Sequence, residues 1–266
     1  MTRIYLVLIC ALVTFSFKSY ASNHLQQVKI CLADDAPWVP YTIWDESLSI
    51  VKTTDITGIL PDVIKEIFSK TRYQYVISPM PRSKVMQNMQ SKESECDIAL
   101  SANLKQERIE VTQYTLPLYK FGIGYFYTGS DSVWVDFSNI NKNEACGIIG
   151  YNYDSFNYKN DIKLVANVSK ALSLLSKNRC QIFLSEIDPI LYGMEQGLYQ
   201  IDQEIYESQD NLLYKVINEK VYHLIVNKQS QNAKSLLAEL NQRLVEIHDD
   251  GTSDAIKSKY LKDFNK

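Results

Sequence analysis

A polar loop behind a predicted buried strand holds the side chains with the clearest binding chemistry. The stretch from Cys96 to Leu100, apolar except for Asp97, leads into Ser101 and Asn103, and Arg108 follows in the same loop. An arginine guanidinium binds a carboxylate through two parallel hydrogen bonds, and hydroxyl and amide groups add further ones. Ligands of open α/β sheets lie beyond the carboxyl ends of the strands. The loop therefore predicts a site for a small organic anion, with an ordinary surface charge as the alternative for Arg108.

Two aromatic side chains follow the first predicted strand. Trp38 and Tyr41 lie in a proline-containing loop, where an aromatic ring can stack on a ligand or cover a bound ammonium group. The alternative is that both rings pack in the core beneath the loop. Arg82 follows Pro81 and offers a further cation, either at the side-chain end of a pocket or at a solvated helix start.

The elements that must position these residues are βα units. Short apolar runs alternate with segments of helical period, which is typical of mostly parallel sheets. The ranges 28–33, 73–78 and 96–101 read as strands, and between the first two the apolar residues Leu60, Val63, Ile64, Ile67 and Phe68 recur at helical spacing. The sequence therefore predicts an α/β fold.

Two further strand patterns predict crossings between two lobes. The range 119–127 is a long strand-like stretch, after which new βα units begin at Cys146, and the range 221–226 is the natural return. A helix with an apolar stripe from Ala233 to Ile247 follows and ends at Gly251, which suits a left-handed cap. We expect a first lobe of residues 22–120 plus 221–266 and a second lobe of residues 121–220.

The first 21 residues resemble a secretory signal peptide. They combine a basic start at Arg3, an apolar run over residues 4–13, and small residues at Ser19 and Ala21. The run is short for a bilayer span, so an uncleaved anchor is the alternative. We expect cleavage after Ala21 and an exported, soluble chain.

Charge and cysteine content narrow the function classes. The formal net charge of −3 and the lack of a basic stripe argue against a nucleic-acid-binding protein.

Cys146 and Cys180 each open an apolar strand pattern, so parallel neighbouring strands would place them at matching ends for a disulfide. Cys31 and Cys96 read as opposite ends of neighbouring strands, and their pairing stays open. Cysteine spacings do not fit zinc and the histidines are scattered, so we expect neither metal nor cofactor.

Four segments in one order resemble a known family. They are Trp38–Tyr41, Gly58–Val63, Asp97–Tyr119 and Asn227–Leu261. The chain resembles bacterial extracellular solute-binding proteins of family 3, which include the periplasmic polar-amino-acid receptors of ABC importers. The resemblance implies a bilobal periplasmic-binding-protein-like fold, with two βα sheet lobes joined by two crossing strands. It also implies a periplasmic monomer that delivers an amino-acid-like ligand to an inner-membrane ABC permease.

The resemblance implies roles for residues in both lobes. Arg108 takes the place of the arginine that binds the α-carboxylate, and Ser101 and Asn103 match positions that hydrogen-bond the ligand's backbone groups. Glu186 stands where an aspartate usually binds the α-ammonium. The alternative is that Glu186 or Asp188 caps the helix that begins near Pro189, because acidic residues stabilise helix N-termini.

A glycine-centred loop also matches the family. Its backbone N–H groups help to bind the carboxylate, and Tyr151 and Asn152 stand beside Gly150 where small hydroxyl residues are common. Bulky residues there change the pocket wall, which favours a smaller or an aromatic-stacked ligand.

Three function classes follow from these residues. The leading one is a binding protein without enzymatic activity. The second is an exported enzyme similar to cyclohexadienyl dehydratases, in which Glu186 would act as the acid or base, although no nucleophile–base pair is visible. The third is a soluble ligand sensor for a membrane receptor. The sequence leaves the ligand's side chain undetermined.

Overall fold

The computed structural model describes most of the chain. The described residues are 26–33, 37–45, 47–91, 93–102, 106–129, 135–149, 151–199 and 212–261, with the side chains of residues 101, 102, 106 and 107 left out. The predicted signal peptide, Asn103 and Gly150 lie outside these residues.

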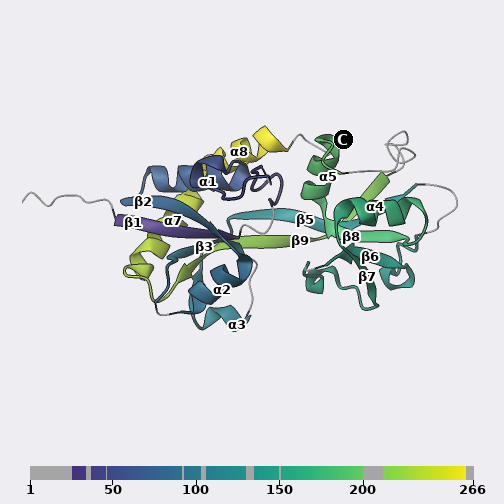
Figure 1. The fold of residues 1–266 in the computed structure, drawn as a ribbon, viewed down its shortest axis with the longest axis horizontal. Coiled ribbons are helices and arrows are strands. Elements are labelled where there is room, and N and C mark those ends of the chain that lie inside the picture. The colour runs from purple at the N-terminus through teal and green to yellow at the C-terminus, as the bar shows by residue number, and fades with distance from the viewer. Residues whose placement is uncertain are drawn as a thin grey trace, which may run out of the picture.

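The first lobe is built from βα units. Its elements are the strands β1 (Gln26–Ala33), β2 (Tyr73–Met80), β3 (Ile98–Ala102) and β4 (Thr112–Tyr114), and the helices α1 (Ile59–Ser69), α2 (Arg82–Gln90), α3 (Gln106–Ile109), α7 (Ala233–Asp249) and α8 (Thr252–Tyr260). β1 pairs in parallel with both β2 and β3. Helices α1 and α8 lie on one side of this sheet and α2 and α3 on the other (Figure 1), and α7 packs against α1 and α8.

Alternate side chains of β1 enter two different cores. Val28, Ile30 and Leu32 belong to the larger core, which α1 and α7 share. Cys31 points the other way and packs with Val85 of α2. Because successive side chains of a strand face opposite sides of the sheet, one strand contributes to both layers. The part of β1 that is covered on both faces, from Ile30 to Ala33, is accordingly a continuous apolar run.

The second lobe is smaller and is also built from βα units. Its elements are β6 (Ala145–Ile148), β7 (Ile162–Val165), β8 (Ile182–Glu186), α4 (Val168–Ser176) and α5 (Ile187–Glu195). β6 pairs in parallel with β7 and β8. Phe126, Leu172 and Phe183 are fully buried in the core of this lobe. Single 3-10 turns at Thr53–Asp55, Ile140–Lys142 and Asp154–Phe156 lie in the connecting segments of the chain.

Two long antiparallel strands run from one lobe into the other. They are β5 (Tyr119–Thr128) and β9 (Leu212–Asn227), paired from Tyr119 opposite Tyr222 to Thr128 opposite Leu212. Figure 1 shows them side by side between the lobes. β9 also pairs with β3 and β4, and β5 pairs with β8, so the strand order is β2-β1-β3-β9-β5-β8-β6-β7. The fold is therefore the bilobal α/β architecture that the sequence predicts.

The pairing of β5 with β9 requires a glycine at one point. The register shifts between Ile123 and Gly124, and a Cβ atom on Gly124 would overlap the carbonyl oxygen of Lys215. The return strand also begins earlier than the expected range 221–226, at Leu212. Residues 215–219 of β9 are all exposed, and their two apolar residues, Val216 and Ile217, are adjacent, so that part of the strand lacks the apolar–polar alternation that marks a strand in sequence.

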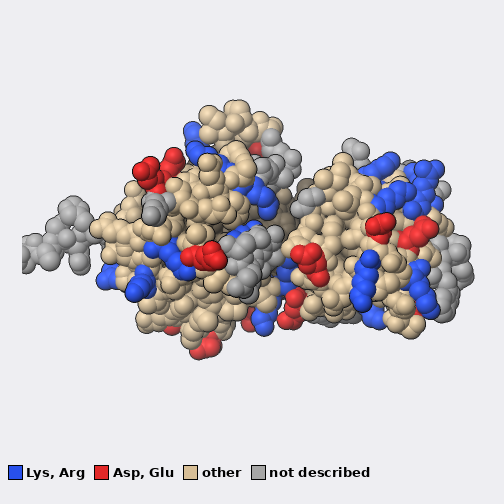
Figure 2. All heavy atoms as spheres, turned by 90° about the horizontal axis from the view of Figure 1, so that it is seen from below, with Lys and Arg blue, Asp and Glu red and all other residues tan. Residues whose placement is uncertain are grey.

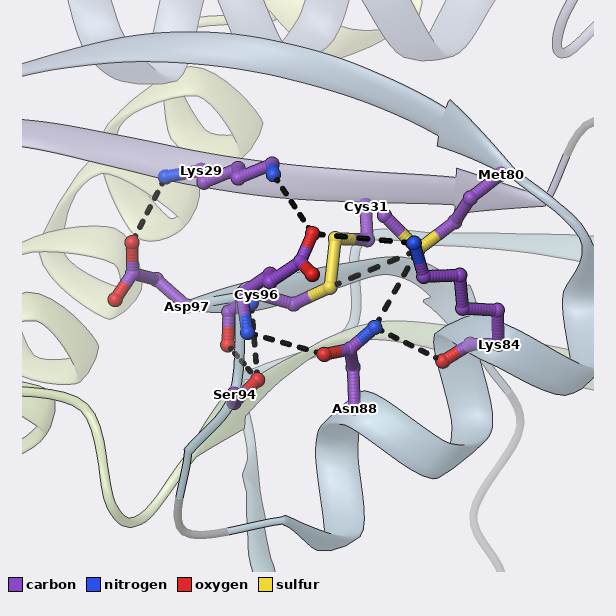
Figure 3. A network of polar contacts seen from close by, with 9 residues as sticks. Lys29, Cys31, Met80, Lys84, Asn88, Ser94, Cys96 and Asp97 are labelled. Carbon is purple, nitrogen blue, oxygen red and sulfur yellow. Dashed lines mark hydrogen bonds and ion pairs between the residues drawn. A yellow bond between two sulfur atoms is a disulfide. The ribbon is translucent and has the colours of Figure 1, made fainter.

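The structure contains two disulfides, one in each lobe. Cys146 is joined to Cys180, and Cys31 to Cys96. The expected pairing of Cys146 with Cys180 is confirmed, because β6 and β8 are parallel neighbours and both cysteines lie at the amino end of their strands, with Cys180 just before β8. Cys31 lies near the carboxyl end of β1 and Cys96 just before β3, and the register of these parallel neighbours brings the two together in the disulfide that the sequence left open. Figure 3 shows the Cys31–Cys96 bridge beside Met80 and Asn88.

The surface carries both signs of charge. On the face seen in Figure 2, basic and acidic side chains are interspersed over both lobes. Every helix within the described ranges is too short or too polar to cross a membrane. Those ranges also contain no group of three histidine, cysteine, aspartate or glutamate side chains placed to hold a metal ion.

Candidate functional site

The junction between β8 and α5 places a carboxylate where the two lobes meet. Glu186 is the last residue of β8 and the N-cap of α5, but its side chain makes no capping hydrogen bond. Instead, its Oε2 accepts a hydrogen bond from Trp38 Nε1 at 3.0 Å. Trp38 comes from the loop after β1, in the first lobe. The helix-cap alternative for Glu186 is therefore wrong, and its carboxylate joins the lobes.

The other carboxylate oxygen of Glu186 is bound from the crossing strand β9. Lys220 Nζ lies 3.3 Å from Oε1, and the Tyr222 hydroxyl lies 3.4 Å from the same atom. The side chains of Lys220 and Glu186 are only 7% and 8% exposed. Lys220 and Tyr222 are two residues apart on one strand, so both side chains leave the same face. The result is a buried ion pair with two neutral hydrogen-bond donors.

Asp188, two residues after Glu186, makes a second contact between the lobes. The Tyr41 hydroxyl donates to Asp188 Oδ2 at 3.0 Å. Lys257 of α8 lies 3.6 Å from the same oxygen. Asp188 is in the first turn of α5, where a negative charge also suits the helix dipole. Both carboxylates at the start of α5 are thus bound by side chains of the first lobe or the crossing strand.

Five aromatic rings pack together beside these carboxylates. Trp38 stacks on Tyr41 with ring centroids 4.5 Å apart, and Tyr41 stacks on Tyr119 at 4.7 Å. Tyr222 stacks on Tyr119 at 5.5 Å, and Phe121 lies within 5.1 Å of Tyr222. Tyr41 is 1% exposed. Core packing is therefore the observed role of the Tyr41 ring, while its hydroxyl and the Trp38 indole face the second lobe.

The loop that carries Trp38 and Tyr41 is held by the start of α1. The backbone N–H groups of Ile59 and Leu60 donate to the carbonyl oxygens of Pro40 and Tyr41. Gly58 precedes them with a positive φ of 118°. A Cβ atom there would come within 2.7 Å of both carbonyl oxygens, so only glycine allows this approach.

Burial governs the protonation of the cluster. It raises the pKa of Glu186 above its ordinary value, against the opposing effects of Lys220, Trp38 and Tyr222. Burial, followed by the charge of Asp188, raises the pKa of Tyr41. Burial, followed by the charge of Glu186, raises the pKa of Tyr222. Both phenols therefore remain protonated donors at neutral pH.

Two further expected site residues, Arg82 and Tyr151, interact electrostatically with the Glu186 cluster. Partial burial and the charge of Glu186 raise the pKa of Tyr151 to about 12, and the positive charge of Arg82 opposes this. The positive charge of Arg82, at the start of α2, also lowers the pKa of Tyr222. Arg82 and Tyr151 therefore face the same region from opposite lobes.

Arg108 and Asn152 lie outside the Glu186 cluster, and the position of the Ser101 side chain is not described. Arg108 is in α3 and is not among the partners of the Glu186 carboxylate. Asn152 accepts a hydrogen bond from the Asp154 backbone at 2.9 Å, which organises its own turn. Ser101 lies in β3, at the strand end facing this region, but its side chain is not described.

Sequence reasoning missed the side chains that complete the cluster. Lys220 and Tyr222 come from β9, and Tyr119 and Phe121 from β5. The available signal was the alternation of Tyr119 with Phe121 and of Lys220 with Tyr222, which puts each pair on one face of its strand.

A comparison with family models identifies the family of this chain. A family model for the bacterial extracellular solute-binding proteins, family 3, matches residues 33–263. The chain belongs to this family. No curated protein matches it individually.

Solved structures share the fold of this family 3 protein. A histidine kinase sensor domain with similarity to periplasmic binding proteins has a TM-score of 0.63 at 16% identity, covering 90% of this chain and 97% of its own. The substrate-binding protein of an amino acid ABC transporter has a TM-score of 0.58 at 17% identity, with 89% and 99% covered. The ancestral amino-acid-binding protein AncCDT-1, a precursor of cyclohexadienyl dehydratase, has a TM-score of 0.62 at 15% identity, with 89% and 96% covered. At these identities the likeness shows the fold alone.

Proposed function

We propose that this protein captures a small polar solute of the amino-acid type between its two lobes and delivers it to an inner-membrane ABC permease. The observation that carries the proposal is the hydrogen bond from Trp38 to Glu186, which joins the lobes at the carboxyl end of β8. Ligands of α/β folds bind beyond such strand ends. Family membership supports the same class of function.

In this proposal the solute's carboxylate faces the arginines of the first lobe. Arg108 is the proposed anchor, with Ser101 and Asn103 adding hydrogen bonds and Arg82 reaching the same region from α2. Tyr151 and Asn152 form part of the opposite wall. A charge-assisted pair with an arginine is stronger than a neutral hydrogen bond, especially once closure has excluded water.

The proposal includes where the protein works. Residues 1–21 act as a signal peptide that is removed after Ala21, and the mature chain is a periplasmic monomer. Its lobes comprise residues 22–120 plus 221–266 and residues 121–220. The solute closes them by bending the crossing strands near residues 119–127 and 218–222, the kind of hinge motion that solute-binding folds use.

One observation also supports an enzymatic candidate. Burial raises the pKa of Glu186, as in many general acids. Its contact with Lys220, however, opposes that rise and keeps the carboxylate bound to a cation of the same chain. We therefore favour binding without turnover.

A thermal-shift screen of amino acids and small carboxylates tests the proposal. A ligand at a hundred times its Kd adds about 2.7 kcal/mol of stability, which raises the Tm of a domain this size by roughly 5–10 °C. Each hit is then incubated with the protein and analysed by mass spectrometry. A hit that is recovered unchanged supports binding, and a hit converted to product would show the protein to be an enzyme. A screen without any stabilising compound would contradict the proposed site.

A further inference from the structure

The carboxylate best placed to meet a ligand's ammonium group is already paired with a cation of this chain. Lys220 Nζ lies 3.3 Å from Glu186 Oε1, and both side chains are more than nine-tenths buried. Trp38 binds the second oxygen at 3.0 Å. A single negative charge is therefore matched by a single positive charge before any solute enters.

The position of Lys220 is fixed by strand register. Lys220 lies opposite Phe121 on β5, and Glu186 on β8 lies opposite Ile123, two residues further along the same strand. The lysine side chain thus crosses β5 diagonally to reach the carboxylate. Its ammonium also lies 5.5 Å from the centre of the Tyr222 ring, a cation–π distance.

Asp188, the neighbouring carboxylate, is bound in a similar way. It accepts from the Tyr41 hydroxyl at 3.0 Å and lies 3.6 Å from Lys257 Nζ. The two acidic side chains at the start of α5 therefore already hold one lysine each. Neither offers an uncompensated negative charge to a solute.

We propose that Lys220 takes the place of the ligand's ammonium group at Glu186. A solute that carried its own ammonium there would lose hydration and meet the like charge of Lys220, and Glu186 alone does not offset both costs. The cleft therefore favours small organic carboxylates without a charged amino group over amino acids of the same carbon skeleton. This inference rests on the proposed function, because it keeps the same cleft and the same arginine anchor for the carboxylate, and it changes the favoured solute from an amino acid to the carboxylate without the amino group.

Matched ligand pairs test the inference on the wild-type protein. Calorimetry compares glutarate with glutamate, propionate with alanine, and 3-phenylpropionate with phenylalanine. We expect the acid without the amino group to bind at least about tenfold more tightly within the pair that binds best, a difference of about 1.4 kcal/mol.

Variants connect that preference to Lys220. Lys220→Met leaves Glu186 without its cation, so the preference should reverse toward the amino acid. Lys215→Met is the matched control, because Lys215 lies on the same strand, is exposed, and has its ammonium over Phe137, 5.1 Å from the ring centre. The control should keep the wild-type preference.

A second variant tests the inference even if Lys220→Met folds poorly. The double substitution Lys220→Met with Glu186→Gln removes both charges and should bind both members of a pair equally, within about twofold.

The outcomes separate the two proposals. If the wild-type protein binds an amino acid more tightly than its counterpart, Lys220 does not replace the ammonium group, and the proposed function stands alone. A double variant that keeps the full wild-type preference would also overturn the inference. If neither class of compound binds the wild-type protein, the proposed function fails and the inference with it.

Discussion

Removing the Lys220 ammonium should destabilise the folded protein strongly. Lys220→Met keeps most of the side chain's apolar volume but leaves the Glu186 carboxylate with only the Trp38 and Tyr222 donors. Breaking a buried ion pair by deleting one partner costs about 3–5 kcal/mol. Because two hydrogen bonds remain, we expect a loss of about 3 kcal/mol at pH 7, which corresponds to a Tm lower by roughly 6–12 °C.

The pH dependence of this loss has a definite sign. The pKa of Glu186 is raised in the folded state above its ordinary value of 4.5 by burial. The folded state therefore binds more protons than the unfolded state above that pH, so the contribution of Glu186 to stability falls as pH rises through its folded pKa. Without Lys220 that folded pKa is higher still. The deficit of Lys220→Met relative to wild type should thus be larger at pH 7 than at pH 4.5, the ordinary pKa of the carboxyl.

Urea unfolding at both pH values measures these differences. Lys215→Met should remain within about 0.5 kcal/mol of wild type, because the Lys215 side chain is exposed. Adding Glu186→Gln to Lys220→Met removes the unpaired charge and should recover most of the loss. If Lys220→Met proves as stable as Lys215→Met at pH 7, the reasoning from the buried pair is refuted.

Three other predictions use the same protein. Arg108→Ala should weaken binding of the best screened carboxylate by about 2 kcal/mol or more in calorimetry, and affinity within twofold of wild type would remove Arg108 from the site. Trp38→Phe removes the indole donor to Glu186, so small-angle scattering without solute should give a larger radius of gyration, and an unchanged value would argue against this contact holding the lobes. Non-reducing peptide mapping should recover Cys146 linked to Cys180 and Cys31 linked to Cys96. Recovery of these cysteines as free thiols from exported protein would contradict the disulfides.

The local elements of the fold were predictable from neighbouring residues. The helical spacing of apolar residues from Leu60 to Phe68 predicts α1, and the apolar run from Val28 to Ala33 predicts β1. Such patterns are readable because each element buries one face or both. The first half of β9 was missed for the same reason, since its exposed residues 215–219 carry no burial pattern.

For the site too, the sequence determined one part and the tertiary structure the other. Sequence alone placed Glu186 at the end of a strand before a helix, because the apolar run and the acidic turn are adjacent in the chain. That Lys220 would neutralise it depends on the register of β5 with β8 and β9, which brings together residues 34 positions apart. Register is set by the pairing of whole strands. The partner of the buried carboxylate, and with it the charge that a solute meets, was therefore decided only by the tertiary structure.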